Sequence, residues 1–112
     1  MKILGIGVDI IEHKRIKNSI KNSNFKNRVL GSNELKQLSS SKNKTNFLSK
    51  RFAAKEAFAK ALGTGFRNNL NFKDIEIVHN KFGKPNYLKN KKITKLIQKN
   101  FKVKNFNCFL SI

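Results

Sequence analysis

The spacing of apolar and polar positions changes several times along the chain, starting from a period of two. In ILGIGVDII, residues 3–11, Ile6, Val8 and Ile10 share one face, while two glycines and Asp9 lie on the other. This alternation predicts a strand. The paired glycines on one face would allow another segment to approach this strand closely.

Helical spacing dominates the middle of the chain. Residues 12–21 and the broken pattern over residues 25–38 predict short helices, and the polar stretch SSSKNKTN at residues 39–46 predicts a loop. The longest predicted helix covers residues 47–62. Gly63 is suited to end it, because glycine adopts the left-handed conformation of a helix C-terminus without steric cost.

The second half of the chain predicts further strands and one more helix. DIEIVHN at residues 74–80 and PNYL at residues 85–88 flank a turn, residues 93–97 form part of a small amphipathic helix, and NFNCFLSI at residues 105–112 alternates like a strand. A strand that ends without a turn needs a neighbour for its backbone groups. The chain contains no internal repeat, so we expect a single α+β domain over residues 1–112.

Composition narrows the choice of partner without deciding it. The formal net charge is +19, which attracts phosphates, nucleic acid, anionic lipid or acidic proteins, although part of the lysine surplus is equally explained by compositional drift. The single cysteine, Cys108, excludes an internal disulfide and suits a buried position. We find no membrane-spanning stretch and expect a soluble protein of the cytoplasm.

Three charged residues interrupt the apolar helical stretch FAAKEAFAKAL. Large apolar side chains form one stripe and alanines another, so the helix should be packed on two sides. Glu56 and Lys60 lie one turn apart between the stripes. This spacing is also that of an ordinary ion pair on a helix surface. Lys55 falls inside the large-residue stripe and must extend to solvent or meet an anion.

Two carboxylates far apart in the sequence suggest a metal site. Asp9 in an apolar strand is costly unless it is paired or binds a metal, although it could simply mark the end of the strand. Asp9 and Glu56 with nearby cations would suit Mg²⁺, which binds one or two protein carboxylates and fills its shell with water and substrate phosphate.

Four motifs, in order, carry a resemblance to a known family. GIGVDIIEHKRI at residues 5–16, FLSKRFAAKEAFAKALGTG at residues 47–65, DIEI at residues 74–77 and GKP at residues 83–85 resemble the holo-[acyl-carrier-protein] synthases, the small bacterial 4′-phosphopantetheinyl transferases. The resemblance implies an antiparallel sheet packed on a long central helix, and a homotrimer with active sites between subunits. It also implies transfer of phosphopantetheine from coenzyme A to a serine of apo acyl carrier protein.

The resemblance assigns roles residue by residue. Asp9 and Glu56 match the Mg²⁺ ligands, and Lys60 matches a lysine beside the pyrophosphate; these three are the expected catalytic residues. A metal-bound water, Glu56 or a carrier-protein carboxylate could accept the serine proton. The residues expected to contact coenzyme A are, besides Lys60, Lys42, Lys44, Arg51, Gly63, Thr64 and Gly65.

The acidic carrier protein is expected to dock on the N-terminal helices. The matching positions are Arg15, Phe25 and Arg28, although Arg15 could be a solvated charge and Phe25 a core residue. The family pattern continues past Ile112 with a histidine-containing segment, which keeps an inactive, shortened relative open as an alternative. A basic nucleic-acid-binding module is a second alternative, but no such motif occurs, and we expect neither nucleic acid nor membrane as a partner.

Overall fold

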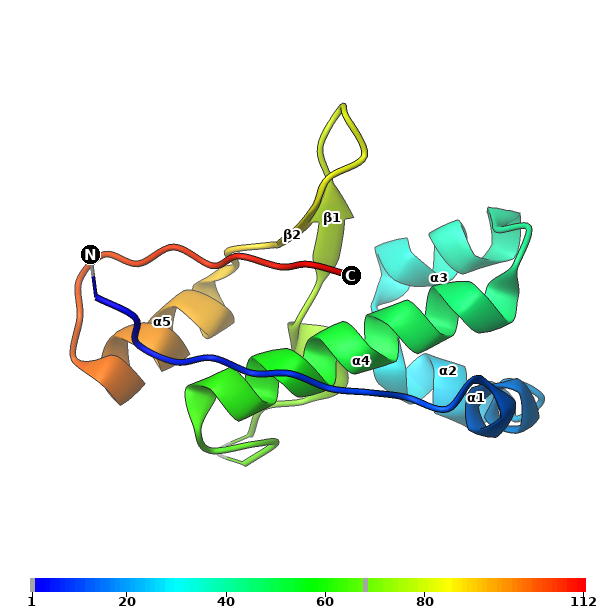
Figure 1. Cartoon of the computed structure of the whole chain (residues 1–112), viewed down its shortest axis with the longest axis horizontal. Helices are drawn as coiled ribbons and strands as arrows, with labels where there is room; N and C mark the ends of the chain where they lie inside the picture. Colours follow the sequence, from blue (N-terminus) through cyan, green and yellow to red (C-terminus); the bar gives the residue numbers. More distant parts are fainter. Residues whose placement is uncertain (1, 68) are drawn as a thin grey trace.

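A computed structural model describes residues 2–67 and 69–112 of the chain, which form five helices, a short 3-10 turn and one hairpin in that described part (Figure 1). The elements, in order, are α1 His13–Ser19, α2 Ser23–Val29, α3 Ser32–Ser40, α4 Lys44–Leu62, the 3-10 turn Phe72–Asp74, β1 Ile77–His79, β2 Pro85–Tyr87 and α5 Lys91–Phe101. No helix in the described part is both long and apolar enough to span a bilayer.

The longest helix, α4, has 19 residues and begins earlier than the sequence suggested. The side chain of Asn43 accepts a hydrogen bond of 2.9 Å from the Asn46 N–H, so the helix starts at Lys44 and the expected loop is shorter. At the other end Gly63 adopts φ of +81°, as predicted for a terminating glycine. Its N–H donates to the Lys60 carbonyl over 3.0 Å.

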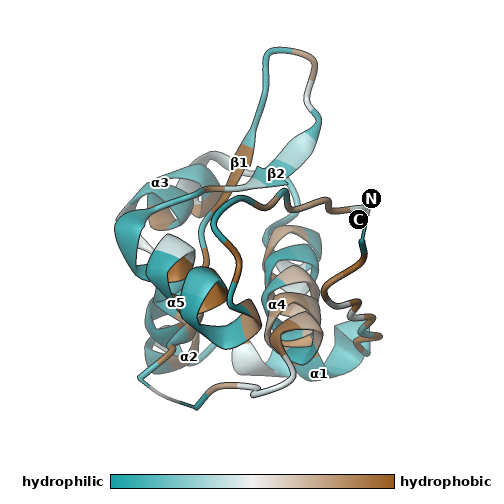
Figure 2. Cartoon of the chain, turned by 90° about the vertical axis from the view of Figure 1, so that its left-hand side faces the viewer, coloured by the Kyte–Doolittle hydropathy of each residue, from teal (hydrophilic) through white to brown (hydrophobic). Residues whose placement is uncertain are grey.

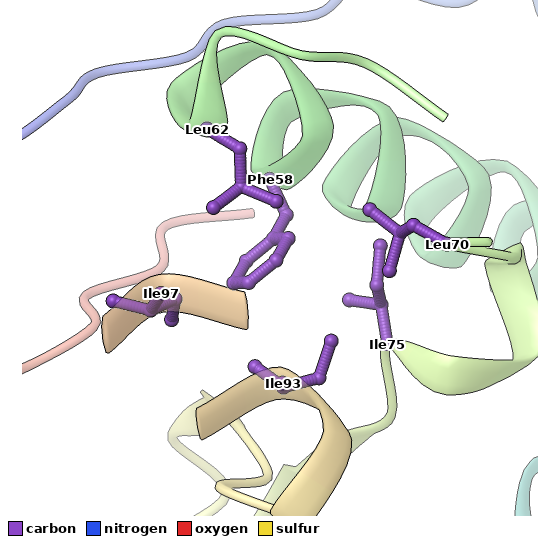
Figure 3. Close-up of a cluster of buried hydrophobic side chains, with 6 residues drawn as sticks. All are labelled: Phe58, Leu62, Leu70, Ile75, Ile93 and Ile97. Atoms are coloured by element: carbon purple, nitrogen blue, oxygen red, sulfur yellow. The ribbon is translucent and has the colours of Figure 1, made fainter. Parts of the chain in front are cut away.

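Two apolar clusters pack against α4. The first joins the C-terminal half of α4 to α5 and the segment before β1, and Figure 3 shows its members Phe58, Leu62, Leu70, Ile75, Ile93 and Ile97 pointing toward one another. The second joins the N-terminal half of α4 to the first three helices through Ile16, Val29, Leu30, Leu38 and Leu48. The predicted packing of this helix on more than one side is therefore present.

The N-terminal segment takes an extended form along α4 and is not part of a sheet (Figure 1). Its glycine face meets the alanine stripe of the helix, while Ile6, Val8 and Ile10 are 80, 70 and 92 % exposed. The predicted alternation of faces is present. The strand assignment over residues 3–11 is wrong for the described chain, because its neighbour is a helix and no described segment pairs with its backbone through backbone hydrogen bonds.

The sheet in the described residues consists of β1 and β2, which pair antiparallel with Ile77 opposite Tyr87. This hairpin stands out from the helices in both views (Figure 1, Figure 2), and Tyr87 ties its base to α4 by a 2.6 Å hydrogen bond to the Ala54 carbonyl. Residues 105–112 are extended and alternate between half-buried and exposed, but they also pair with no strand. Their prediction as a strand is wrong in the same sense.

Candidate active site

The three predicted catalytic side chains come together where the N-terminal segment crosses α4. The Lys60 ammonium lies 2.8 Å from Asp9 Oδ1 and donates a second hydrogen bond of 3.1 Å to the Val8 carbonyl. Glu56 stands one helical turn before Lys60 on the same helix. Residues separated by about fifty positions in the sequence thus form one charged cluster at the surface.

The carboxylates of Asp9 and Glu56 are close enough to repel each other electrostatically. Burial raises the pKa of Glu56, and the negative charge of Asp9 raises it further. The cations Lys60 and Arg15 oppose this shift. The ionised form of Glu56 is therefore less stable here than in water, and a bound cation between the two carboxylates would relieve the repulsion.

The donor set fits a hard divalent cation. In the described part of the chain no three His, Cys, Asp or Glu side chains gather, so Asp9 and Glu56 offer two carboxylates and no softer ligand. Mg²⁺ takes one or two protein carboxylates and keeps water and phosphate oxygens in its other positions. Zinc sites, in contrast, usually have three or four histidine, cysteine or carboxylate ligands.

Two glycines set the position of Asp9. A methyl group on Gly5 would lie 2.0 Å from the Ala61 carbonyl oxygen, and one on Gly7 would lie 1.9 Å from the Ala57 carbonyl oxygen. Both distances are far below van der Waals contact, so only glycine permits this approach. The glycine and alanine faces together bring the Asp9 carboxylate to Lys60.

The predicted coenzyme A turn follows the same end of α4. Gly63 and Gly65 have φ of +81° and +64°, and the Gly65 N–H donates to the Ala59 carbonyl over 3.2 Å. From α5, the side-chain amide of Asn100 donates a 2.7 Å bond to the Leu62 carbonyl. Thr64 is half-buried between the two glycines, in the turn that begins three residues after Lys60.

The predicted phosphate lysines lie at the opposite end of α4. Lys42 and Lys44 border an open groove of about 900 Å³ between the first three helices and the start of α4, together with Lys21 and Lys26. Sixteen residues of helix separate Lys44 from Lys60, or about 24 Å along the axis. In one chain these lysines and the carboxylate cluster do not converge.

Arg51, predicted to contact the nucleotide, is turned into the protein. Its Nε lies 3.2 Å from Glu34 Oε2, its guanidinium stacks 4.5 Å from the centre of the Phe47 ring, and an NH₂ group donates 3.2 Å to Gln37. Burial lowers the Arg51 pKa, and Glu34 opposes that shift. Whether Arg51 also meets a nucleotide stays a prediction.

Glu34 is the residue that sequence reasoning missed. Local spacing places it only within the helical pattern over residues 25–38, yet its carboxylate is buried and lies 2.5 Å from the Lys55 ammonium. This contact supplies the anion that a lysine in the apolar stripe of α4 requires. The unexplained Lys55 was the available signal, but nothing in local spacing pointed to Glu34 as its partner.

The predicted docking residues lie on neighbouring helices. Arg15 on α1 and Arg28 on α2 are exposed, so their guanidinium groups face solvent. Phe25 is half-buried, with its ring 5.7 Å from that of Phe52. Phe25 therefore has packing contacts of its own, and its role toward a carrier protein stays a prediction.

Comparison with known proteins gives a consistent result. Residues 5–109 match the family model of the 4′-phosphopantetheinyl transferase superfamily. The whole chain is 58 % identical over 112 residues to a holo-[acyl-carrier-protein] synthase of Pelagibacter ubique (strain HTCC1062), covering 88 % of that relative.

Solved structures agree with this match. The holo-[acyl-carrier-protein] synthase of Neisseria meningitidis superposes with a TM-score of 0.80 at 41 % identity, covering 88 % of this chain and 80 % of that one. The Bacillus anthracis str. Ames synthase in complex with CoA (3′,5′-ADP) gives a TM-score of 0.73 at 41 % identity, covering 80 % and 77 %. The chain, with its α+β fold and clustered Asp9, Glu56 and Lys60, belongs to the holo-[acyl-carrier-protein] synthases, enzymes of the 4′-phosphopantetheinyl transferase superfamily.

Proposed function

We propose that the protein transfers 4′-phosphopantetheine from coenzyme A to a serine of apo acyl carrier protein in a Mg²⁺-dependent reaction. The serine oxygen forms a bond to the β-phosphorus and gives up its proton to a general base, the bond from that phosphorus to the bridging oxygen breaks, and adenosine 3′,5′-bisphosphate leaves. The observation that carries the proposal is the cluster of Asp9, Glu56 and Lys60 in a chain matched over its full length by a synthase. Its unpaired cysteine is compatible with the cytoplasm as the location.

Asp9 and Glu56 would hold the metal ion. Burial and the charge of Asp9 both raise the pKa of Glu56, so a cation shared by the two carboxylates would stabilise the ionised form of Glu56. When bound, Mg²⁺ supplies charge neutralisation at the pyrophosphate of coenzyme A. The two carboxylates would thus define where the pyrophosphate lies relative to α4.

Lys60 would act on the leaving group. Its ammonium is half-exposed and now contacts Asp9 over 2.8 Å, so it stands at the surface where a diphosphate would approach the carboxylates. A fixed positive charge at this point favours the negative charge that builds on the leaving phosphate during bond cleavage. Gly63, Thr64 and Gly65 would border the same ligand from the turn that follows Lys60.

The carrier protein would dock through charge. Arg15 and Arg28 are exposed on adjacent helices, and the net charge of +19 favours an acidic partner. Arg15 also acts electrostatically on Glu56, which links the docking face to the carboxylate cluster. A serine presented along this face would reach the reacting phosphate from the α1 side.

A homotrimer would complete the site. Lys42 and Lys44 are about 24 Å along α4 from Lys60, so a second copy is the natural source of phosphate lysines for each cluster. The exposed apolar row Ile6, Val8 and Ile10 and the unpaired backbone beside it give such a copy a surface to cover.

The test is direct. The protein is incubated with apo acyl carrier protein, coenzyme A and Mg²⁺, and the carrier is read by intact mass. We expect the mass of one phosphopantetheine to be added, EDTA to stop the gain and excess Mg²⁺ to restore it. Glu56→Ala should remove turnover while circular dichroism stays that of the wild type. An unmodified carrier under all conditions would overturn the proposal.

A further inference from the structure

A single buried carboxylate joins three helices on the far side of α4 from the N-terminal segment. Glu34, 1 % exposed, lies 2.5 Å from the Lys55 ammonium through Oε1 and 3.2 Å from Arg51 Nε through Oε2. Its Oε1 also accepts the Gly31 N–H over 3.2 Å at the start of α3. The contact with Arg51 is an ion pair whose two atoms are not aligned for a hydrogen bond, so Lys55 provides the hydrogen-bonded link from the first turn of α3 to α4.

The Lys55 ammonium extends this contact to α2. Besides Glu34, it donates a 2.6 Å hydrogen bond to the carbonyl of Val29, the last residue of α2. A cation at a helix C-terminus meets the negative end of the helix and an otherwise unpaired carbonyl. Glu76 is a second carboxylate that acts on Lys55, more weakly than Glu34 does.

The residues next to these contacts are the ones on which transfer depends. Arg28 directly precedes Val29 on α2, and Glu56 directly follows Lys55 on α4. One chain of short bonds, from Glu34 through Lys55 to Val29, thus determines where the carrier-facing helix lies relative to the proposed metal ligand. Apolar contacts are less directional than hydrogen bonds, and in some proteins a buried ionic group selects one arrangement of the packed elements.

We propose that Glu34 is a positioning residue for the transfer reaction, which sets the docked carrier serine at the correct distance from the Glu56 site. This inference rests on the proposed function. Glu34 is too deeply buried to contact either substrate itself. Without its charge, each substrate still binds its own surface, but the two surfaces are no longer held in register, and the loss falls on the catalytic step.

The test compares Glu34→Gln with a matched control elsewhere in the chain. Asp74 repeats the local chemistry, because its Oδ2 accepts the Asn71 N–H over 2.8 Å and lies 2.6 Å from the Lys92 ammonium, but this ion pair leads to α5 and takes no part in the contacts between Glu34, Lys55 and Val29. Both Glu34→Gln and Asp74→Asn remove one charge and keep an oxygen. Both are measured well below their melting temperatures, with the number of active sites counted by coenzyme A titration.

For Glu34→Gln we expect kcat at saturating carrier to fall about tenfold or more, as for a misplaced reacting group. The Kd values for coenzyme A and for apo carrier, measured separately by calorimetry and fluorescence anisotropy, should stay within about twofold of the wild type. Asp74→Asn should keep the wild-type kcat.

Three results would overturn the inference. One is an unchanged kcat in Glu34→Gln, and another is an equal loss in Asp74→Asn, which would indicate general destabilisation. The third is a fall in the coenzyme A site count that accounts for the whole loss of kcat, which would show local unfolding. Failure of the proposed function can be distinguished from failure of this inference, because in the first case the wild type itself would modify no carrier.

Discussion

Replacing Gly7 by alanine should separate the two halves of the proposed metal site. The new methyl would lie 1.9 Å from the Ala57 carbonyl oxygen and 2.8 Å from the Ala61 nitrogen, whereas ordinary contact begins at 3.4 Å. Both neighbours are helix backbone and cannot turn aside. The N-terminal segment must therefore move outward by about 1.5 Å, and Asp9, two residues further on, must move with it.

The effect on activity should exceed the effect on stability. No backbone–backbone hydrogen bond joins residues 2–11 to another described segment, so the segment can shift without unfolding the helices. A displacement of about 1 Å at a reacting centre costs on the order of 100-fold in rate. Overpacking costs roughly 1–3 kcal/mol. We expect turnover to fall about 100-fold with a raised Mg²⁺ requirement, while the far-ultraviolet circular dichroism is unchanged.

The assay is carrier modification by intact mass across a Mg²⁺ titration, with Gly83→Ala as the matched control. Gly83 has a left-handed φ of +82° and open space around it, so alanine there costs backbone strain of about 1 kcal/mol without touching α4. The control should keep the wild-type Mg²⁺ dependence. If Gly7→Ala matched the wild type in rate and in Mg²⁺ dependence, the close approach would not be what places Asp9.

Three further outcomes test other parts of the account. Arg15→Glu should raise the KM for carrier protein about tenfold and leave the KM for coenzyme A unchanged. Lys95→Glu, at an exposed position of α5, should change neither KM. Equal effects of Arg15→Glu on the two KM values would refute the docking role. Glu56→Gln should raise the melting temperature of the metal-free protein by about 1–4 °C, because the raised pKa of Glu56 means that its charge is unfavourable in the fold. Added Mg²⁺ should stabilise only the wild type. A lower melting temperature for the metal-free variant would contradict this. Burial raises the pKa of the Cys108 thiol and so reduces its thiolate fraction. We therefore expect Ellman's reagent to react slowly with the native protein at pH 8, faster at higher pH, and at the ordinary rate in guanidinium. Equal rates in native and denatured protein would show that the thiol is accessible to solvent in the fold.

Local patterns predicted the elements that depend on neighbouring residues. The helices around Ile16, Phe58 and Ile97 follow from their apolar spacing, and the Gly63 terminus follows from backbone conformation alone. The glycine face beside Asp9 was correctly expected to accept a close neighbour, and the structure identifies this neighbour as the alanine stripe of α4.

Features that depend on distant partners could not be predicted in the same way. An alternating segment becomes a strand only beside another edge, and the described chain brings none to residues 3–11 or 105–112. Lys55 signalled a buried anion, but the choice of Glu34 depends on how α3 folds back on α4. Residue chemistry suggested Asp9 and Glu56 as a metal pair, but local spacing explained Asp9 equally well as the end of a strand, and the family resemblance decided between these two interpretations.

The central claim is that Asp9 and Glu56 share one divalent cation beside a diphosphate. Anomalous diffraction from crystals grown with coenzyme A and Mn²⁺ tests it most directly, because manganese substitutes for magnesium at oxygen ligands and marks its own position. We predict a single strong peak with oxygens of Asp9, Glu56 and the pyrophosphate all within about 2.4 Å of the ion. A peak held by only one of the two carboxylates, or no peak between them while coenzyme A is bound, would contradict the account.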